Sequence, residues 1–341
     1  MASNDDGFVV SSLKEANELF KAGFADVLYG VPLGVDKIGL AEELLMKNYD
    51  LQVFVDSLEI LELMMAKSKK ISKWSIFIKI DCENGRAGIK WNDEKLLDLV
   101  DKILKNPEYF KLTGLYAHCG NTYSNNGDVE VALDIARLTA SRILEAKTKL
   151  IENFTSYSKI LENLNCGIGS TPTCSLLQNE NDPKNQCFKN LTELHAGNYT
   201  FYDVMQEKIG SCQSYEVAAK LLGRVISIKN DKSRAIVDCG FTAISKQGFD
   251  QKEGIMKDRM VLAGSKSTEL KFIGVSQEHG KIEGPDVEKL KIGDEVFIYP
   301  WHSCVFSSLF QNFFAYESEV SDDLTDHVIT KVLPVTTGHW F

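Results

Sequence analysis

The first two hundred residues alternate short apolar segments with stretches of helical periodicity, and this alternation strongly limits the folds open to the chain. Strand–helix alternation predicts parallel strands joined by helical crossovers. The segments predicted as strands are 8–10, 26–30, 51–55, 74–81, 112–118, 166–169 and 191–195. A closed (β/α)8 barrel needs one strand more than these seven. We therefore expect an α/β fold of the TIM-barrel type from which the first strand is missing.

Near residue 215 the sequence changes in character, because helical patterns give way to short strand-like segments between Gly- and Lys-rich turns. The predicted strands here are 223–229, 234–239, 270–275 and 295–299. Strands without intervening helices are typical of antiparallel sheets. We therefore predict two domains, a barrel over residues 1–214 and a mainly antiparallel β domain over residues 215–341.

Charge and composition exclude several classes of partner. A formal net charge of −10 argues against nucleic acid or an anionic membrane as the main partner. No apolar run approaches the roughly 18 residues of a membrane-spanning helix. The first ten residues lack the basic and apolar segments of a signal peptide. The eight cysteines are scattered without a CxxC pair, which favours reduced thiols and a cytoplasmic protein.

The segment 296–304, VFIYPWHSC, is interpreted as a strand that continues into His302 and Cys304. In extended backbone, residues i and i+2 point to the same face, with Cα atoms about 6.6 Å apart. An imidazole nitrogen and a thiolate sulfur on one face can share a Zn²⁺ ion that keeps open positions. An unrelated His and Cys is the commoner explanation of a bare HxC. The segment 276–280, SQEHG, either orients a metal ligand or caps a turn.

Small residues follow the last two predicted barrel strands. Ser170 and Thr171 follow one of them, and Gly197 and Asn198 follow the other. Small residues let backbone N–H groups approach an anion, and barrel enzymes often bind a phosphate after their last two strands. Each pair alone is an ordinary turn signal. Together they favour a ligand that carries a phosphate.

Two earlier strand ends are also polar. Arg86 lies in the DCENGR segment after the strand 74–81, where it either donates to an anionic oxygen or is a solvated loop charge. Tyr116, His118 and Tyr123 lie at the end of the next predicted strand. A lone histidine there is more often a core residue. Tyrosine, histidine and glycine together favour a functional site.

Ten segments carry a resemblance to a known family. In order they are SSLKEANEL, FADVLYGVP, LQVFVDSLE, IKIDCENGRAG, GLYAHCGNTYS, GIGSTPT, ELHAGNYTFYD, VDCGFTAIS, SQEHG and PWHSC. With them the chain resembles the eukaryotic D-serine dehydratases. These belong to the D-serine dehydratase/D-threonine aldolase family of fold-type III pyridoxal-phosphate enzymes. SQEHG followed by PxHxC is specific to this family, and the resemblance covers nearly the whole chain.

The resemblance implies a barrel plus a β domain, paired as a homodimer, with pyridoxal phosphate and Zn²⁺ as cofactors. The matches to cofactor-contacting positions are Tyr123, Thr171, Gly197 and Asn198, with Tyr116 added, and Arg86 matches a position near the cofactor's phenolic oxygen. His302 and Cys304 match the zinc ligands. The implied reaction is loss of water from D-serine to give pyruvate and ammonia. Aldol cleavage of β-hydroxy D-amino acids, as in D-threonine aldolase, is the alternative.

One feature of the family has no counterpart here. Its Schiff-base lysine lies at the end of the first barrel strand, in a motif like HVKTHK, and this sequence has no such motif. Lys14 belongs to the helix after the strand 8–10, and Lys79 lies inside the strand 74–81, so neither matches. We expect an N-terminally incomplete chain with little or no D-serine dehydratase activity. A lysine-less descendant, which binds the cofactor or only a partner subunit, is the alternative.

Overall fold

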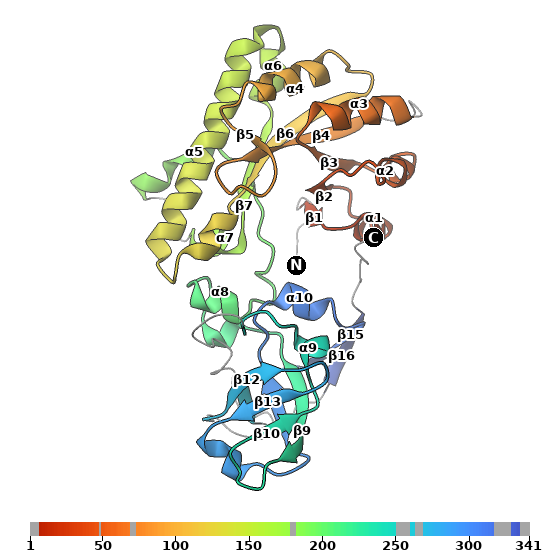
Figure 1. Cartoon of the computed structure of the whole chain (residues 1–341). Coiled ribbons are helices and arrows are strands. Elements are labelled where there is room, and N and C mark those ends of the chain that lie inside the picture. The colour runs from red at the N-terminus through yellow and green to blue at the C-terminus, as the bar shows by residue number, and fades with distance from the viewer. Residues whose placement is uncertain are drawn as a thin grey trace. The chain divides into compact units, whose positions relative to one another are not determined.

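The computed structural model describes residues 7–47, 49–68, 73–177, 182–249, 260–262, 269–316 and 329–334. These residues divide into two compact units, one up to Gly197 and the other from Asn198 onward. The first unit carries a parallel sheet, and the second carries an antiparallel one (Figure 1). The predicted boundary between residues 214 and 215 lies inside the second unit.

The sheet of the first unit confirms the predicted parallel barrel strands. Its order is β1-β2-β3-β4-β6-β7-β8, every neighbouring pair is parallel, and the short strand β5 is added to β4. The strands are β1 (Phe8–Val10), β2 (Val27–Pro32), β3 (Leu51–Val55), β4 (Trp74–Asp81), β5 (Ile89–Lys90), β6 (Phe110–His118), β7 (Asn165–Gly169) and β8 (Glu193–Leu194). Within the described residues β1 and β8 each pair on one side only, so the sheet is an open part of a barrel.

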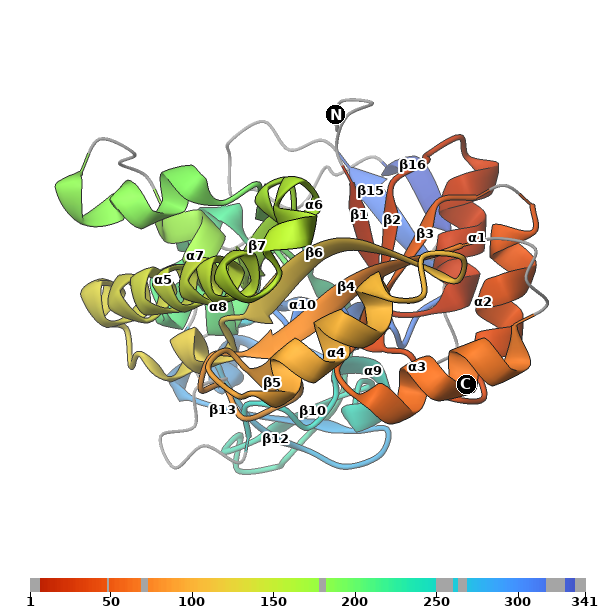
Figure 2. The same ribbon diagram turned by 90° about the horizontal axis from the view of Figure 1, so that it is seen from above.

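Helices follow the strands in the order that the periodicity predicted. They are α1 (Leu13–Lys21), α2 (Ile38–Leu45), α3 (Leu58–Lys67), α4 (Lys95–Leu104), α5 (Val129–Asn153), α6 (Ser158–Glu162) and α7 (Thr171–Leu176), with 3₁₀ turns η1 (Gly120–Ser124), η2 (Thr155–Tyr157) and η3 (Pro183–Asn190). Figure 2 shows α1, α2, α3, α4 and α5 along the outside of the sheet. The side chain of Ser12 caps α1 in a capping box with Glu15.

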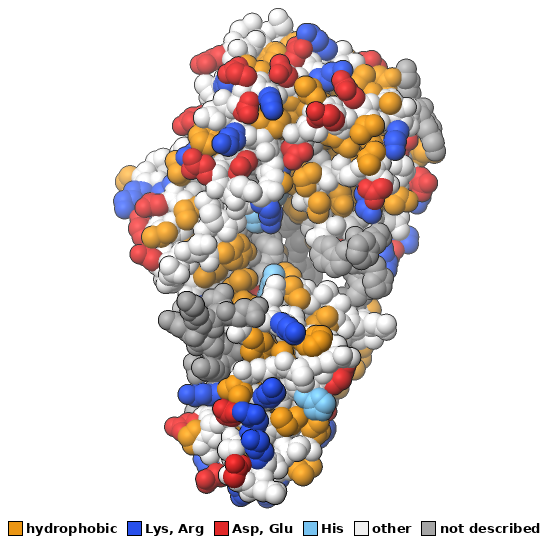
Figure 3. All heavy atoms as spheres, viewed as in Figure 1, with side chains coloured by type: hydrophobic (Ala, Val, Ile, Leu, Met, Phe, Trp, Pro, Cys, Tyr) orange, Lys and Arg blue, Asp and Glu red, His pale blue; other side chains and the backbone are white. Residues whose placement is uncertain are grey.

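The parallel sheet separates two layers of apolar side chains. The large outer core lies between strands and helices, and a smaller inner cluster joins Leu28, Phe54, Phe77 and Tyr116. All residues of β3, and those of β4 up to Ile80, are buried, as expected for parallel strands that are covered on both faces. Figure 3 shows acidic and basic side chains interspersed over the visible face of this unit.

Gly169 ends β7 in very close contact with the chain after β8. A Cβ atom on residue 169 would lie 2.2 Å from the carbonyl oxygen of His195, which is a backbone atom with little freedom to move. By contrast, a Cβ on Gly39, inside helix α2, would meet no atom within 4 Å.

We expect Gly169→Ala to lower the free energy of unfolding by about 1–3 kcal/mol, because the extra methyl group overpacks this contact. The matched change Gly39→Ala should raise stability by roughly 0.5–1 kcal/mol, because alanine loses less backbone entropy in a helix. Urea denaturation followed by circular dichroism measures both. Equal effects of the two changes would contradict the close approach at Gly169.

The second unit confirms the predicted antiparallel β domain. Its larger sheet has the order β11-β14-β9-β10-β13-β12, and β15 pairs with β16 in a separate two-stranded sheet. The strands are β9 (Leu221–Ile228), β10 (Ala235–Val237), β11 (Met260–Leu262), β12 (Lys271–Val275), β13 (Gly280–Glu283), β14 (Glu295–Ile298), β15 (Asn312–Tyr316) and β16 (Ile329–Pro334). Three short helices, α8 (Val204–Lys208), α9 (Phe241–Ile244) and α10 (Ser303–Ser307), accompany them with η4 (Ser214–Glu216) and η6 (Pro285–Lys289). Sequence patterns missed β11, β13, β15 and β16.

Two further findings concern membrane spans and disulfide bonds. None of the described helices has the length and apolarity needed to span a membrane. All eight cysteines are free thiols.

Candidate active site

The carboxyl ends of β4, β6 and β7 bring three positions into one row. Lys79 is the register partner of Tyr116, and Tyr116 is the partner of Gly167. A Cβ on residue 167 would lie 3.0 Å from Cδ2 of Tyr116, so the glycine leaves room for the ring. The carboxyl ends of parallel barrel strands are where barrel enzymes place their reactive groups.

Tyr116 is the centre of an aromatic stack. Its ring lies 4.3 Å from the imidazole of His195 at an interplanar angle of 19°, and 5.3 Å from the ring of Phe54. Its hydroxyl donates a hydrogen bond of 3.4 Å to the carbonyl oxygen of Gly169. Burial raises the pKa of Tyr116 well above its usual value. The phenol therefore remains protonated at neutral pH.

Lys79 is a lysine inside an otherwise apolar strand. Its side chain is buried, and its Nζ lies 4.2 Å from the ring centroid of Tyr116 and 4.6 Å from that of Phe54. Burial, together with the positive charge of Arg86, lowers the pKa of Lys79 to about 7, and Cys119 and Asp56 oppose this shift. Lys79 therefore carries a partly neutral amine near pH 7.

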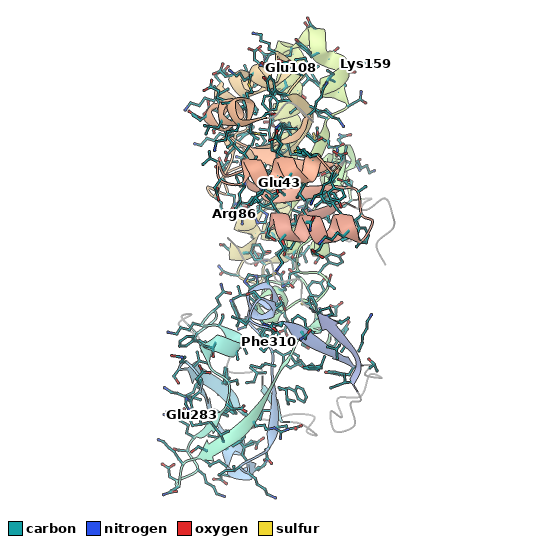
Figure 4. The ribbon with its side chains drawn as sticks, turned by 90° about the vertical axis from the view of Figure 1, so that its right-hand side faces the viewer. Glu43, Arg86, Glu108, Lys159, Glu283 and Phe310 are labelled. Atoms are coloured by element: carbon teal, nitrogen blue, oxygen red, sulfur yellow. The ribbon has the colours of Figure 1, made fainter. Side chains whose placement is uncertain are left out.

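Arg86 extends from the loop after β4 and is exposed (labelled in Figure 4). Within the described part of the chain its guanidinium makes no ion pair and no hydrogen bond. Its charge nevertheless contributes to lowering the pKa values of Lys79 and His118.

His118 ends β6, two residues beyond Tyr116 and on the same face of the strand. Burial lowers the pKa of His118 to about 3, and the positive charges of Arg86 and Lys79 add to the effect. Its imidazole is therefore neutral at physiological pH. Tyr123 lies in η1, directly after β6, and is near enough to Tyr116 to influence its pKa.

Ser170 and Thr171 begin helix α7. The hydroxyl of Ser170 accepts a 3.2 Å hydrogen bond from the backbone N–H of Thr173 and lies 2.9 Å from the hydroxyls of both Thr122 and Thr173. This network occupies the side chain of Ser170 with capping. A Cβ atom on residue 197 would lie 3.9 Å from Oγ1 of Thr171, so the backbone of Gly197 is close to that hydroxyl. The structure thus brings together the two small-residue loops at this pair, as predicted.

In the second unit one buried carboxylate organises the segments around Asn198 and His302. Asp203 is fully buried, and its Oδ1 accepts a 2.8 Å hydrogen bond from the backbone N–H of Gln206. Its Oδ2 accepts a 2.9 Å hydrogen bond from the backbone N–H of Ser303 and a second hydrogen bond from the side-chain amide of Asn198. Asp203 therefore accepts hydrogen bonds from backbone N–H groups in the first turns of both α8 and α10.

The backbone near His302 and Cys304 differs from the sequence prediction. Strand β14 ends at Ile298, His302 is the N-cap of α10, and Cys304 lies in the first turn of that helix. The prediction of one extended strand through Cys304 is therefore wrong. Asp203 provides the reason, because its carboxylate binds the N–H of Ser303 and favours a helix start there.

His302 remains suited to bind a metal through one ring nitrogen. Its Nδ1 lies 3.0 Å from Oε1 of Gln247, which leaves Nε2 available. Burial lowers the pKa of His302, and the charge of Asp203 opposes this shift. Within the described residues no group of three His, Cys, Asp or Glu side chains is arranged to hold a metal ion.

The SQEHG segment forms the turn between β12 and β13. The backbone N–H of Ser276 donates a 2.8 Å hydrogen bond to the carbonyl oxygen of His279, which closes the turn. The Thr242 hydroxyl donates a 2.9 Å hydrogen bond to the carbonyl oxygen of Gln277. Of the two interpretations left open for this segment, these contacts support turn formation.

Four residues with a place in these arrangements were not singled out from sequence, namely Asp203, Gln247, His195 and, as a reactive group, Lys79. Only Lys79 left a usable signal, because a lysine within the apolar run WSIFIKID is unusual for a buried parallel strand. His195 pairs with Glu193 at 2.9 Å, and its Nδ1 is buried without a hydrogen-bond partner in the described structure.

Comparison with protein families covers both units. The family described as alanine racemase, N-terminal domain matches residues 1–155, and the putative serine dehydratase domain matches residues 218–316. D-serine dehydratase from Dictyostelium discoideum is 31% identical over 332 residues, which cover 90% of this chain and 78% of that protein. D-serine dehydratase from Saccharomyces cerevisiae is 29% identical over 346 residues, or 91% and 78% of the two chains.

Solved structures agree with this assignment. D-threo-3-hydroxyaspartate dehydratase from Delftia sp. HT23 is 26% identical with a TM-score of 0.78, over 91% of this chain and 81% of that one. D-threonine aldolase from Filomicrobium marinum shares the fold. It is 17% identical with a TM-score of 0.71, over 97% of this chain and 81% of that one. These likenesses place the chain among the fold-type III, pyridoxal-phosphate-dependent lyases. Within that class, the chain belongs to the D-serine dehydratase family.

Proposed function

We propose that this chain eliminates water from D-serine, giving pyruvate and ammonia, with pyridoxal phosphate and Zn²⁺ as cofactors. The observation that carries the proposal is the 31% identity over 332 residues to a D-serine dehydratase. The polar groups at the carboxyl ends of β4, β6 and β7 support it. D-serine is a small molecule, and nothing in this reaction requires nucleic acid or a membrane.

The first unit has side chains that fit pyridoxal phosphate. The phosphate is assigned to Thr171 and Gly197, whose loops approach each other closely. Ser170 would contribute only through its backbone, because its hydroxyl is occupied. Asn198, the next residue and the first of the second unit, stays a predicted contact.

The ring of the cofactor is assigned to Tyr116 and Tyr123, with the guanidinium of Arg86 donating to the phenolic oxygen. The neutral imidazole of His118 adds no positive charge beside Arg86. When bound, pyridoxal phosphate supplies an electron sink for a carbanion at Cα of the amino acid. The residues of this chain orient the ring and balance its charge.

Zinc is assigned to Nε2 of His302 and the thiolate of Cys304. Gln247 accepts a hydrogen bond from Nδ1–H, which selects the tautomer whose Nε2 can bind metal. A zinc ion with open positions supplies Lewis-acid activation of a hydroxyl leaving group.

We expect the purified chain to bind Zn²⁺, and His302→Ala and Cys304→Ser to abolish the binding. Gln247→Ala should weaken it by about 10–100-fold, as is typical for loss of a residue that orients a metal ligand. The matched control is His279→Ala, which removes the exposed histidine of the SQEHG turn. Isothermal titration with Zn²⁺ measures all four variants. Zinc binding that survives His302→Ala, or is lost with His279→Ala, would contradict the assignment.

A second substrate class is favoured by one observation. The Delftia protein similar to this chain is a D-threo-3-hydroxyaspartate dehydratase, and its likeness extends over most of both chains. Aldol cleavage is supported only by likeness of fold to D-threonine aldolase. All three reactions start from a β-hydroxy D-amino acid.

We expect low but stereospecific release of pyruvate from D-serine, with none from L-serine. The assay measures the keto acid from D-serine and D-threo-3-hydroxyaspartate, and the aldehyde from D-threonine, with pyridoxal phosphate and Zn²⁺ present. Preferred turnover of D-threo-3-hydroxyaspartate would replace the substrate assignment. No product from any of the three would overturn the proposed function. Homodimer formation and a cytoplasmic location stay predictions.

A further inference from the structure

Asp203 joins two segments of the second unit that lie a hundred residues apart in the chain. Its Oδ2 accepts one hydrogen bond from the side-chain amide of Asn198 and another, of 2.9 Å, from the backbone N–H of Ser303. The carboxylate is fully buried, and hydrogen bonds to an ionised acceptor are stronger than neutral ones. The position of Asn198 and that of Ser303 therefore depend on each other.

Further hydrogen bonds join the same two segments, and each of them has a backbone carbonyl oxygen as its acceptor. They run from the N–H of Val204 to Pro300 at 3.2 Å, from the N–H of Met205 to Trp301 at 3.1 Å, and from the hydroxyl of Ser303 to Tyr202. The segments 198–205 and 300–304 are thus hydrogen-bonded to each other along most of their length. A constraint on one of them restricts the other.

The two segments carry residues that are assigned to different cofactors. Asn198 is a predicted contact of the phosphate group, whereas His302 and Cys304 are the assigned zinc ligands. Ser303, whose N–H is bound by Asp203, lies between these two zinc ligands in the chain. One carboxylate therefore connects the backbone of the assigned zinc site to a residue of the assigned phosphate site.

We propose that Asp203 is a positioning residue that couples the binding of zinc to the binding of pyridoxal phosphate. The inference rests on the proposed function, because it needs the zinc ligands and the phosphate contact that are assigned there. Each ligand orders the segment that it contacts, and the hydrogen bonds of Asp203 extend this order to the other segment. The second ligand then loses less conformational entropy when it binds. By linkage, each ligand raises the affinity for the other by the same factor.

The test measures this factor by titration in both directions. Zn²⁺ is titrated with and without saturating pyridoxine 5′-phosphate, and pyridoxine 5′-phosphate is titrated with and without saturating Zn²⁺. This probe carries an alcohol in place of the aldehyde of pyridoxal phosphate, so it does not react with lysine side chains. We expect each ligand to tighten the binding of the other by about 5–150-fold, the usual range of such couplings.

Two substitutions of Asp203 and one control decide whether the carboxylate carries the coupling. Asp203→Ala removes both acceptor oxygens, so the factor should fall to about one. Asp203→Asn keeps one acceptor oxygen for the donors of Asn198, Ser303 and Gln206, and should give an intermediate factor in a protein closer to wild type in stability. Gln247→Ala is the matched control, because it weakens zinc binding and leaves the hydrogen bonds of Asp203 in place. Its factor should equal that of wild type.

The outcomes separate the coupling from the proposed function. A wild type that binds both ligands with a factor of one or less would overturn the coupling and leave the proposed function intact. The same holds if the variants of Asp203 have lower affinities but the factor of wild type, because Asp203 would then have a structural role alone. A factor that Gln247→Ala lowers as much as Asp203→Ala does would also overturn the coupling. Failure of wild type to bind either Zn²⁺ or pyridoxine 5′-phosphate would overturn the proposed function as well.

Discussion

Replacing Lys79 by methionine should make the protein more stable at pH 6 by about 2–4 kcal/mol. The native state must desolvate the lysine amine, whose pKa falls from 10.5 to about 7. A pKa difference of this size corresponds to a penalty on the order of 5 kcal/mol for the charged form. Methionine has similar length without the charge, and it loses only the cation–ring contacts, worth roughly 0.5–2 kcal/mol. Urea denaturation of both proteins measures the difference.

The same comparison has a definite pH dependence. Below about pH 7 the lysine is protonated in both the folded and the unfolded chain, so the whole penalty is present. Between about pH 7 and pH 10.5 the unfolded chain binds the proton and the folded chain does not, so the stability of wild type rises with pH. The advantage of Lys79→Met should therefore shrink steadily across this window.

The control for this prediction is Lys111→Met. Its side chain is exposed on β6, and the change should stay within about 0.5 kcal/mol of wild type at every pH. A Lys79→Met protein that is less stable than wild type at pH 6 would show that Lys79 has a stabilising partner. An advantage that does not change with pH would show that its amine titrates normally.

Asp203→Ala should lower the free energy of unfolding of the second unit by about 3–5 kcal/mol. The change removes the cap of α8 and leaves the N–H groups of Gln206 and Ser303 without acceptors. A lost cap costs about 1 kcal/mol, and a buried donor without a partner costs about 1–3 kcal/mol. Zinc affinity should fall as well, because the Ser303 N–H fixes the backbone next to His302. Urea denaturation and zinc titration measure the two effects.

Two matched variants define what Asp203 contributes. Asp203→Asn keeps the shape of the side chain and one acceptor oxygen. It should therefore lower the free energy of unfolding by less than Asp203→Ala does. Asp128→Ala removes the cap of α5 at an exposed site, and should cost about 1 kcal/mol without any effect on zinc. If Asp203→Ala costs no more than Asp128→Ala, the carboxylate does not hold α8 and α10 together.

Much of the fold follows from local patterns. The alternation of apolar strands with helical periods predicted the seven-strand path and most helices of the first unit. The residue types at the strand ends also placed Thr171 and Gly197 on loops that the structure brings together. Parallel strands make this possible, because their carboxyl ends lie at one edge whatever the intervening sequence.

Local patterns failed where contacts between distant residues decide the outcome. VFIYPWHSC has strand propensity, yet the chain turns into α10 because Asp203, a hundred residues earlier, binds the N–H of Ser303. Strands β13 and β16 were missed because short or exposed strands carry little periodicity of their own.

Periodicity and turn residues sufficed for the order of strands and helices, since both depend on neighbours along the chain. The properties of the reactive groups depended on tertiary structure. Nothing in WSIFIKID distinguishes a lysine that stays charged from one that does not. Only the assembled sheet buries Lys79 between Tyr116 and Phe54 and brings the charge of Arg86 near it. Desolvation and electrostatic interaction act through space, so the chemistry of the amine was decided by the fold.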